Sequence, residues 1–208
     1  MHLLGYDYFA DQCDGRLGLA SLVDEILDLR AGNTGATLLF DNGDFLQGNP
    51  LGDILAATLG GDETHPMIAA MNCLRYDAIT LGNHDFDYGV PFLRRALGRI
   101  KADVVSANIC CADRPSLAAP FRILTRDVTC NDGIVRPVKI GVTGFAPPQS
   151  ADRDNTSAPG AVKVDDIVQS ARRVVPQIKD AGADVVVALC HSGIGDHCET
   201  GFMENAAI

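Results

Sequence analysis

The chain has 208 residues, of which 47% are apolar, and its 27 acidic and 17 basic residues give a formal net charge of −10. An acidic chain without a Lys/Arg block argues against binding to nucleic-acid polymers or an anionic membrane surface, but it can bind phosphate where metal ions supply a positive field. No apolar stretch reaches the ~18–20 residues that span a bilayer, and the first residues lack a signal-peptide pattern.

Helix-like and strand-like patterns alternate in the first half of the chain. Residues 17–31 predict an amphipathic helix, because one stripe collects Leu19, Leu22, Val23, Ile26 and Leu27. The other predicted elements are strands at 36–40, 77–81 and 103–108 and helices at 51–59, 66–75 and about 90–100. Such alternation is typical of an α/β domain.

The second half begins with two β-rich runs, 121–130 and 134–145, joined by the hairpin signal Asn131-Asp132-Gly133. Residues 146–162 predict a long loop, and a helix follows from about 164 to 178, kinked by Pro176 and ended by Gly182. The uninterrupted apolar run 185–189 predicts a strand buried on both faces. Residues 202–208 resemble the start of a further helix.

Together these elements predict a single α/β domain in which layered, mixed β-sheets are flanked by helices. The seven cysteines are scattered and show no Cys-x-x-Cys spacing, which argues against a disulfide framework and a zinc ribbon. We expect most of them to be small buried apolar residues.

Polar side chains stand directly after three of the predicted strands. Asp44 follows the strand at 36–40, Asn83-His84-Asp85 follows the strand at 77–81, and His191 follows the run 185–189. Loops at the carboxyl ends of strands surround the crevice in which α/β sheets place their chemistry. These side chains are therefore candidates for a metal centre.

Each candidate also has a simpler interpretation. Asp44 and Asn83 are residue types that favour turns and helix caps. His84 is compatible with an exposed surface position, and His191 with a satisfied core histidine. As ligands, carboxylate and amide oxygens suit hard cations, whereas an imidazole can protonate a leaving oxygen.

Two further features concern the histidines. Asp85 is a candidate to hold the ring of His84 through its second nitrogen. His2, His65 and His197 lack a comparable context, so surface or local roles are predicted for them.

Four segments carry a resemblance to a known family: residues 6–11, 40–53, 81–89 and 182–193. Through them the chain resembles the calcineurin-like metallophosphoesterase superfamily, specifically the 2',3'-cyclic-nucleotide 2'-phosphodiesterase/3'-nucleotidase family within the 5'-nucleotidase group. Gln47-Gly48-Asn49-Pro50, together with Asp7-Tyr8, points to the cyclic-phosphodiesterase branch. The resemblance covers essentially the whole chain.

The resemblance implies two divalent metal ions (Zn, Mn, Mg or Ca) and a nucleotide substrate. Asp44 would bridge the two ions, and Asn83 and His191 would bind the second. His84 would contact the phosphate and protonate the leaving oxygen, with Asp85 orienting it. Two such ions activate a water and neutralise phosphate oxygens.

Two family segments are absent from these 208 residues: an Asp-x-His that would precede Met1 and a Gly-His-x-His that would follow Ile208. We therefore expect residues 1–208 to be a fragment of one catalytic domain, separate from a C-terminal nucleotide-binding domain. Such a fragment should bind metal weakly and have little activity. The resemblance implies a periplasmic location, whereas the scattered cysteines favour the cytoplasm slightly.

Two alternative functions remain open. One is a 5'-nucleotidase or UDP-sugar hydrolase, and the other is a non-catalytic domain that binds a nucleotide or a partner.

Overall fold

A computed structural model describes residues 2–7, 9–33, 37–111, 116–148, 150 and 162–193. Most of the predicted loop at 146–162, His197 and the predicted helix start at 202–208 lie outside the described residues. In the described part, no helix is both long enough and apolar enough to cross a membrane.

Helices and strands alternate as predicted. The helical elements are η1 (Leu19–Leu22), α1 (Val23–Gly32), α2 (Pro50–Thr58), α3 (Pro66–Cys73), η2 (His84–Phe86), α4 (Val90–Leu97) and α5 (Ile167–Asp180). The strands are β1 (Tyr6–Asp7), β2 (Gln12–Cys13), β3 (Phe40–Asp41), β4 (Ala78–Ile79), β5 (Asp103–Val104), β6 (Ile109–Cys111), β7 (Phe121–Thr129), β8 (Val135–Phe145), β9 (Val162–Val164) and β10 (Val185–Cys190).

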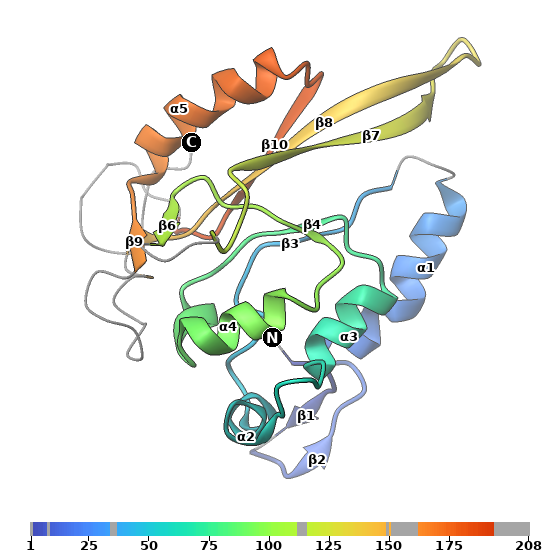
Figure 1. The fold of residues 1–208 in the computed structure, drawn as a ribbon. Coiled ribbons are helices and arrows are strands. Elements are labelled where there is room, and N and C mark those ends of the chain that lie inside the picture. The colour runs from blue at the N-terminus through green and yellow to red at the C-terminus, as the bar shows by residue number, and fades with distance from the viewer. Residues whose placement is uncertain are drawn as a thin grey trace.

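Two three-stranded sheets form the centre of the fold, with helices on their outer sides (Figure 1). One sheet has the order β3-β4-β5 and is parallel. The other has the order β10-β8-β7 and is mixed, because its central strand β8 pairs in parallel with β10 and antiparallel with β7. Helix α5 lies over the second sheet, whereas α1, α3 and α4 lie beyond the first (Figure 1). The predicted layered α/β architecture is confirmed.

The sheets pack on each other through a small apolar core. Ala78 and Val105 of the first sheet region meet Val142 and Leu189 of the second. The two sheets approach each other tightly at Gly144, where an added Cβ would lie 2.1 Å from the Thr80 hydroxyl oxygen. Only a residue without a side chain fits there, so this glycine lets the ends of the two sheets come together.

Local sequence signals account for several boundaries. Asn131-Asp132-Gly133 turns β7 into β8, with Gly133 at φ 77°, as a hairpin requires. The side chain of Asp166 caps α5 by accepting a hydrogen bond from the N–H of Gln169 at 2.8 Å. Pro176 lies inside α5, and Gly182, at φ 86°, follows its end.

The prediction that residues 185–189 are buried on both faces is confirmed only in part: Val187 and Leu189 pack in the core between the sheets and Val186 packs with α5, but most of the strand is not fully buried. Among the described residues β10 pairs with β8 alone and so lies at an edge of its sheet, and Val185 is 49% exposed. Ala188 is also exposed, and only Leu189 in the run is buried. An apolar run reports the composition of a strand but not its place in the sheet, and an edge position leaves one side of the strand open to solvent.

The cysteine prediction is wrong for the described residues. Cys13, Cys73 and Cys110 are exposed, and the other described cysteines are only partly buried. Cys13 and Cys110 lie in the two-stranded ribbons β1–β2 and β6–β9, which leave much of their surface open. His65, in contrast, is buried at 4% exposure and has a local role, since its Nδ1 accepts the N–H of Met67 at the start of α3.

Candidate metal centre

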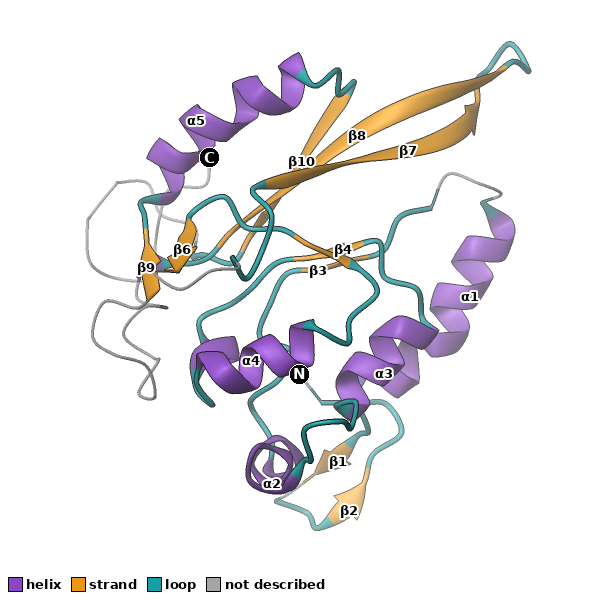
Figure 2. Cartoon of the chain, in the orientation of Figure 1, coloured by secondary structure: helices purple, strands orange, loops and turns teal. Residues whose placement is uncertain are grey.

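The carboxyl ends of β3, β4, β8 and β10 lie on the same side of the molecule (Figure 2). The loops that leave β3, β4 and β10 bring together the side chains that the sequence singled out at three separate positions. His191 Nε2 lies 3.1 Å from Asp44 Oδ2, although 147 residues separate the two in the chain. The predicted convergence of these strand ends is present in the structure.

A tight backbone turn presents Asp44. Gly43 has φ 93° and Asp44 itself has φ 63°, a left-handed conformation that is uncommon for a residue with a side chain. Asp44 Oδ1 accepts the N–H of His84 at 2.8 Å, and Oδ2 faces His191. Strained backbone of this kind persists only where its surroundings hold it, and it concentrates at functional sites.

Gly82 allows this close assembly. A Cβ at Gly82 would lie 2.2 Å from Asp44 Oδ1 and 2.7 Å from His191 Cε1. Neither side chain can move away freely, because Asp44 accepts the N–H of His84 and the His191 ring is hydrogen-bonded to the carbonyl oxygen of Asn42. The absence of a side chain at Gly82 is therefore a condition for bringing Asp44 and His191 together.

Asn83 and His191 line one hollow of about 280 Å³. Its other lining residues are Asn42, Pro147, Ser192 and Gly193. Asn83 is 2% exposed and sits at the start of η2. Carboxylate, amide and imidazole donors are thus gathered at the edge of a polar recess.

The charges of Asp44 and His191 are coupled. Partial burial of Asp44 opposes ionisation, but the hydrogen bonds and charges of His191 and His84 together outweigh it, so the pKa of this carboxyl lies below its usual value. The hydrogen bond to Asp44 in turn raises the pKa of His191, against the opposing effect of burial. Nearby, burial raises the pKa of Asp41 to about 6. A cation at this place would find an ionised carboxylate.

The donor set fits part of a metal centre. Two ligands at about 2.1 Å from one cation and 3.1 Å apart subtend about 95°, an angle that ordinary coordination geometries contain. Among the described residues, however, no group of three or more His, Cys, Asp or Glu side chains is placed to hold a metal ion. Asp44 and His191 supply two such side chains, and Asn83 adds an amide, so the arrangement corresponds to an incomplete ligand set.

His84 is oriented by Asp87 rather than by Asp85. His84 Nδ1 lies 2.7 Å from Asp87 Oδ2, and the two residues are three apart in and after the short helix η2. The predicted contact between His84 and Asp85 is wrong, because one position along a helical turn points the side chain of Asp85 away from that of its neighbour. The i, i+3 spacing of His84 and Asp87 was the signal in the sequence that could have found this pair.

Asp85 instead organises the loop that carries Asp44. It is fully buried, and its two oxygens accept the backbone N–H groups of Gly82, Asp44, Phe45 and Leu46 at distances from 2.8 to 3.2 Å. Burial raises the pKa of Asp85, whereas these N–H groups act in the opposite direction. The contacts of Asp85 in this structure are with the protein backbone, which gives it a positioning role.

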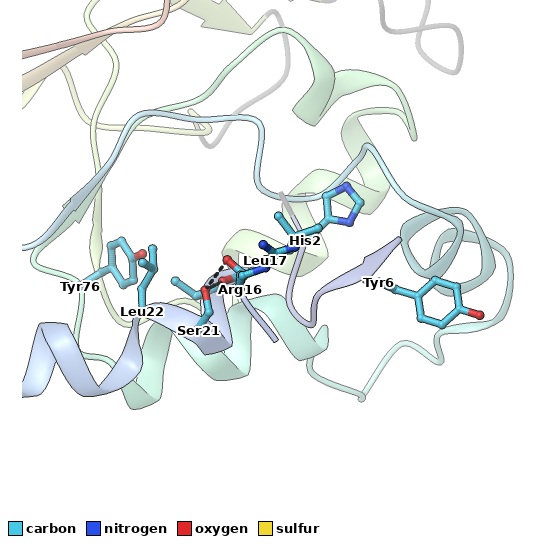
Figure 3. Close-up of a pocket in the computed structure, with 9 residues that line it drawn as sticks. His2, Tyr6, Arg16, Leu17, Ser21, Leu22 and Tyr76 are labelled. Carbon is cyan, nitrogen blue, oxygen red and sulfur yellow. Dashed lines mark hydrogen bonds between the residues drawn. The ribbon is translucent and has the colours of Figure 1, made fainter. Parts of the chain in front are cut away.

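A second hollow, of about 540 Å³, lies between the N-terminal segment and η1 (Figure 3). His2, Tyr6, Leu22 and Tyr76 are among its lining residues. It contains none of the predicted site residues, so its size does not make it the candidate centre.

Comparison with known proteins identifies relatives of this chain. No protein-family model matches the chain. The chain is 39% identical over 212 residues to the trifunctional nucleotide phosphoesterase protein YfkN of Bacillus subtilis, an alignment that covers 100% of this chain and 14% of that protein. It is 38% identical to the 2',3'-cyclic-nucleotide 2'-phosphodiesterase/3'-nucleotidase of Salmonella typhimurium, over 93% of this chain and 30% of the relative.

Among solved structures, the calcineurin-like phosphoesterase YfkN of Bacillus subtilis matches with a TM-score of 0.88 and 38% identity, over 99% of this chain and 64% of that one. A putative 5'-nucleotidase from Staphylococcus aureus matches with a TM-score of 0.73 and 25% identity, over 96% of this chain and 38% of that one. The chain therefore belongs to the calcineurin-like phosphoesterases, in the group that includes the 5'-nucleotidases and the 2',3'-cyclic-nucleotide phosphodiesterases.

Proposed function

We propose that this chain forms the catalytic part of a longer, metal-dependent phosphoesterase that hydrolyses 2',3'-cyclic nucleotides to 3'-nucleotides and these to nucleosides. The observation that carries the proposal is the meeting of Asp44, Asn83 and His191 at the ends of two sheets, beside His84. The cyclic-nucleotide substrate is favoured because relatives with that name are 36–38% identical, whereas a snake venom 5'-nucleotidase is 29% identical.

Asp44, Asn83 and His191 would hold the metal. Asp44 has two oxygens that can serve two cations, and Asn83 and His191 would complete the ligands of one of them. Bound divalent ions of this kind lower the pKa of a water and neutralise phosphate oxygens. The mixture of carboxylate, amide and imidazole donors is compatible with Zn, Mn, Mg or Ca.

His84 would serve as the general acid. Asp87 engages Nδ1, which fixes the orientation of the ring, so Nε2 is the nitrogen that would donate a proton to the leaving oxygen. The His84 side chain is 36% exposed, which is enough for contact with a bound phosphate ester. The hollow beside Asn83 and His191 offers room for the phosphoryl group.

The test uses protein expressed from the full reading frame and loaded with Mn²⁺ or Zn²⁺. We expect turnover of 2',3'-cyclic AMP and 3'-AMP, lost on chelation and restored by metal. No turnover of 2',3'-cyclic AMP would sink the proposal, and faster turnover of 5'-AMP than of 3'-AMP would place the protein with the 5'-nucleotidases. Nucleotide binding without turnover of any ester would instead indicate a non-catalytic domain.

We further propose that residues 1–208 belong to one catalytic domain and that the parent protein carries a separate C-terminal nucleotide-binding domain. The chain spans 14% and 30% of the two curated relatives described above, which supports a longer parent. We expect the parent in the periplasm, on the family resemblance. Cell fractionation with an antibody against this chain tests the location, and detection only in the cytoplasm contradicts it.

A further inference from the structure

Asn42 connects the loop after β3 to the end of β10 by two hydrogen bonds. Its side-chain Nδ2 donates to the carbonyl oxygen of Cys190 at 2.9 Å. Its own backbone carbonyl lies 2.7 Å from Nδ1 of His191. One residue of the first sheet region therefore contacts two consecutive residues at the end of a strand in the second sheet.

The contact with the carbonyl determines how His191 presents its ring. A carbonyl oxygen can only accept, so Nδ1 of His191 carries the proton in this hydrogen bond. The other ring nitrogen, Nε2, is then directed at Asp44. A histidine ligand whose second nitrogen is held in this way keeps both its tautomer and its orientation.

The side chains of Asp41 and Asp85 hold the backbone of the loop after β3: they accept the N–H groups of Gly43 at 2.9 Å and of Asp44 at 2.8 Å. These bonds stay within the first sheet region and do not reach the end of β10. Among the described residues β10 pairs with β8 alone, and the hydrogen bonds of that ladder do not reach the loop after β3. The amide of Asn42 spans this gap between the sheets.

We infer that Asn42 is a positioning residue for His191: its side-chain amide holds the end of β10 against the loop after β3, so that its own carbonyl fixes the His191 ring as a ligand. The inference rests on the proposed function, since it takes His191 to be a metal ligand.

The variant Asn42→Ala removes the tether and leaves the backbone carbonyl in place. In the purified full-length protein we expect its Mn²⁺ affinity, measured by titration calorimetry, to fall about 10- to 100-fold, the range seen when partners of ligand side chains are removed. Asn42→Asp keeps the size but cannot donate, and its added negative charge would by itself strengthen cation binding. Weaker binding in this variant therefore comes from the lost donor.

Asn72→Ala is the matched control. Asn72 also donates from its side-chain amide to a carbonyl, that of Arg99 at 2.9 Å, but on helix α3, away from the centre. We expect unchanged Mn²⁺ affinity in this variant. If Asn42→Ala binds Mn²⁺ within twofold of the wild-type protein, or if Asn72→Ala loses as much affinity, the inference is overturned.

A second measurement needs no metal. With ¹⁵N-labelled histidine, the hydrogen-bonded ring N–H of His191 should give a slowly exchanging resonance in the metal-free protein, and Asn42→Ala should speed its exchange with water at least tenfold. An unchanged exchange rate of this N–H would contradict the proposed role of the Asn42 side chain. If the wild-type protein binds no metal, the proposed function fails, and this exchange rate still decides the role of Asn42.

Discussion

Replacing Asp85 with Asn tests whether this residue organises the site or takes part in the chemistry. In the structure Oδ1 accepts the N–H groups of Phe45 and Leu46, and Oδ2 accepts those of Gly82 and Asp44. An amide of the same shape retains one oxygen and therefore two of the four bonds. Its NH₂ group faces the other two N–H donors and cannot accept from them.

The size of the effect follows from those two unmet donors. A buried donor without a partner costs about 1–3 kcal/mol, so two cost about 2–6 kcal/mol. The neutral amide also avoids the cost of burying a charge, so we expect a net loss near the lower end, about 2–3 kcal/mol. Such a loss is a large share of the ~5–15 kcal/mol by which a typical domain is stable.

Urea unfolding followed by circular dichroism measures this loss, which should lower the midpoint by about 1 M. Asp166→Asn is the matched control, because Asp166 caps α5 with a single accepted N–H bond and Asn caps helices equally well. That variant should stay within about 0.5 kcal/mol of the wild type. If Asp85→Asn unfolds like the wild-type protein yet loses turnover, Asp85 is a catalytic group and our reasoning about the loop is wrong.

Four further outcomes follow from the same geometry. His84→Ala should lower kcat about 10²- to 10⁴-fold with an unchanged urea midpoint, and unchanged turnover would remove His84 from the mechanism. Asp87→Asn should lower kcat about tenfold or more, because His84 Nδ1 loses its carboxylate, and a stability loss without a kinetic effect would argue for a purely structural pair. Gly82→Ala should weaken Mn²⁺ binding at least tenfold, since its Cβ would meet Asp44 Oδ1 at 2.2 Å, and tight binding in this variant would contradict the close assembly. Burial lowers the pKa of His65 from its usual value of 6.5, so the folded protein resists protonation of this side chain. The free energy of unfolding should therefore be at its full value above pH 6.5 and fall as the pH drops below it. His65→Asn should flatten this dependence, and an unchanged slope of stability against pH would exclude His65 as its source.

The sequence predicts the order of elements well because local signals determine most of it. Asn131-Asp132-Gly133 specifies the turn between β7 and β8, and Asp166 specifies the start of α5. Strand length is less local: β3, β4 and β5 each pair over only two residues, although the apolar runs that predicted them are longer. A run shows that a segment suits a buried position, whereas the length of a ladder depends on partners elsewhere in the chain.

The site divides in the same way. That Asp44, Asn83 and His191 would meet could be inferred from their positions after strands, since the carboxyl ends of neighbouring strands converge. Asp85 and its role could not be inferred from sequence proximity to His84, because four N–H groups from two different loops determine where that carboxylate turns.

Asp85 and Asp87, the two acidic residues after His84, therefore have separate roles, and their different spacing from His84 accounts for the difference. Asp85, one position on, points inward to the backbone of the Asp44 loop, and Asp87, three positions on, returns to the same side of η2 as His84. A short helix thus connects a carboxylate that shapes the loop carrying Asp44 to one that orients His84, the proposed acid. Because both depend on the same turn, a change in the geometry of η2 would disturb Asp44 and His84 together, and the loss of metal affinity and the loss of proton transfer should appear in the same variants.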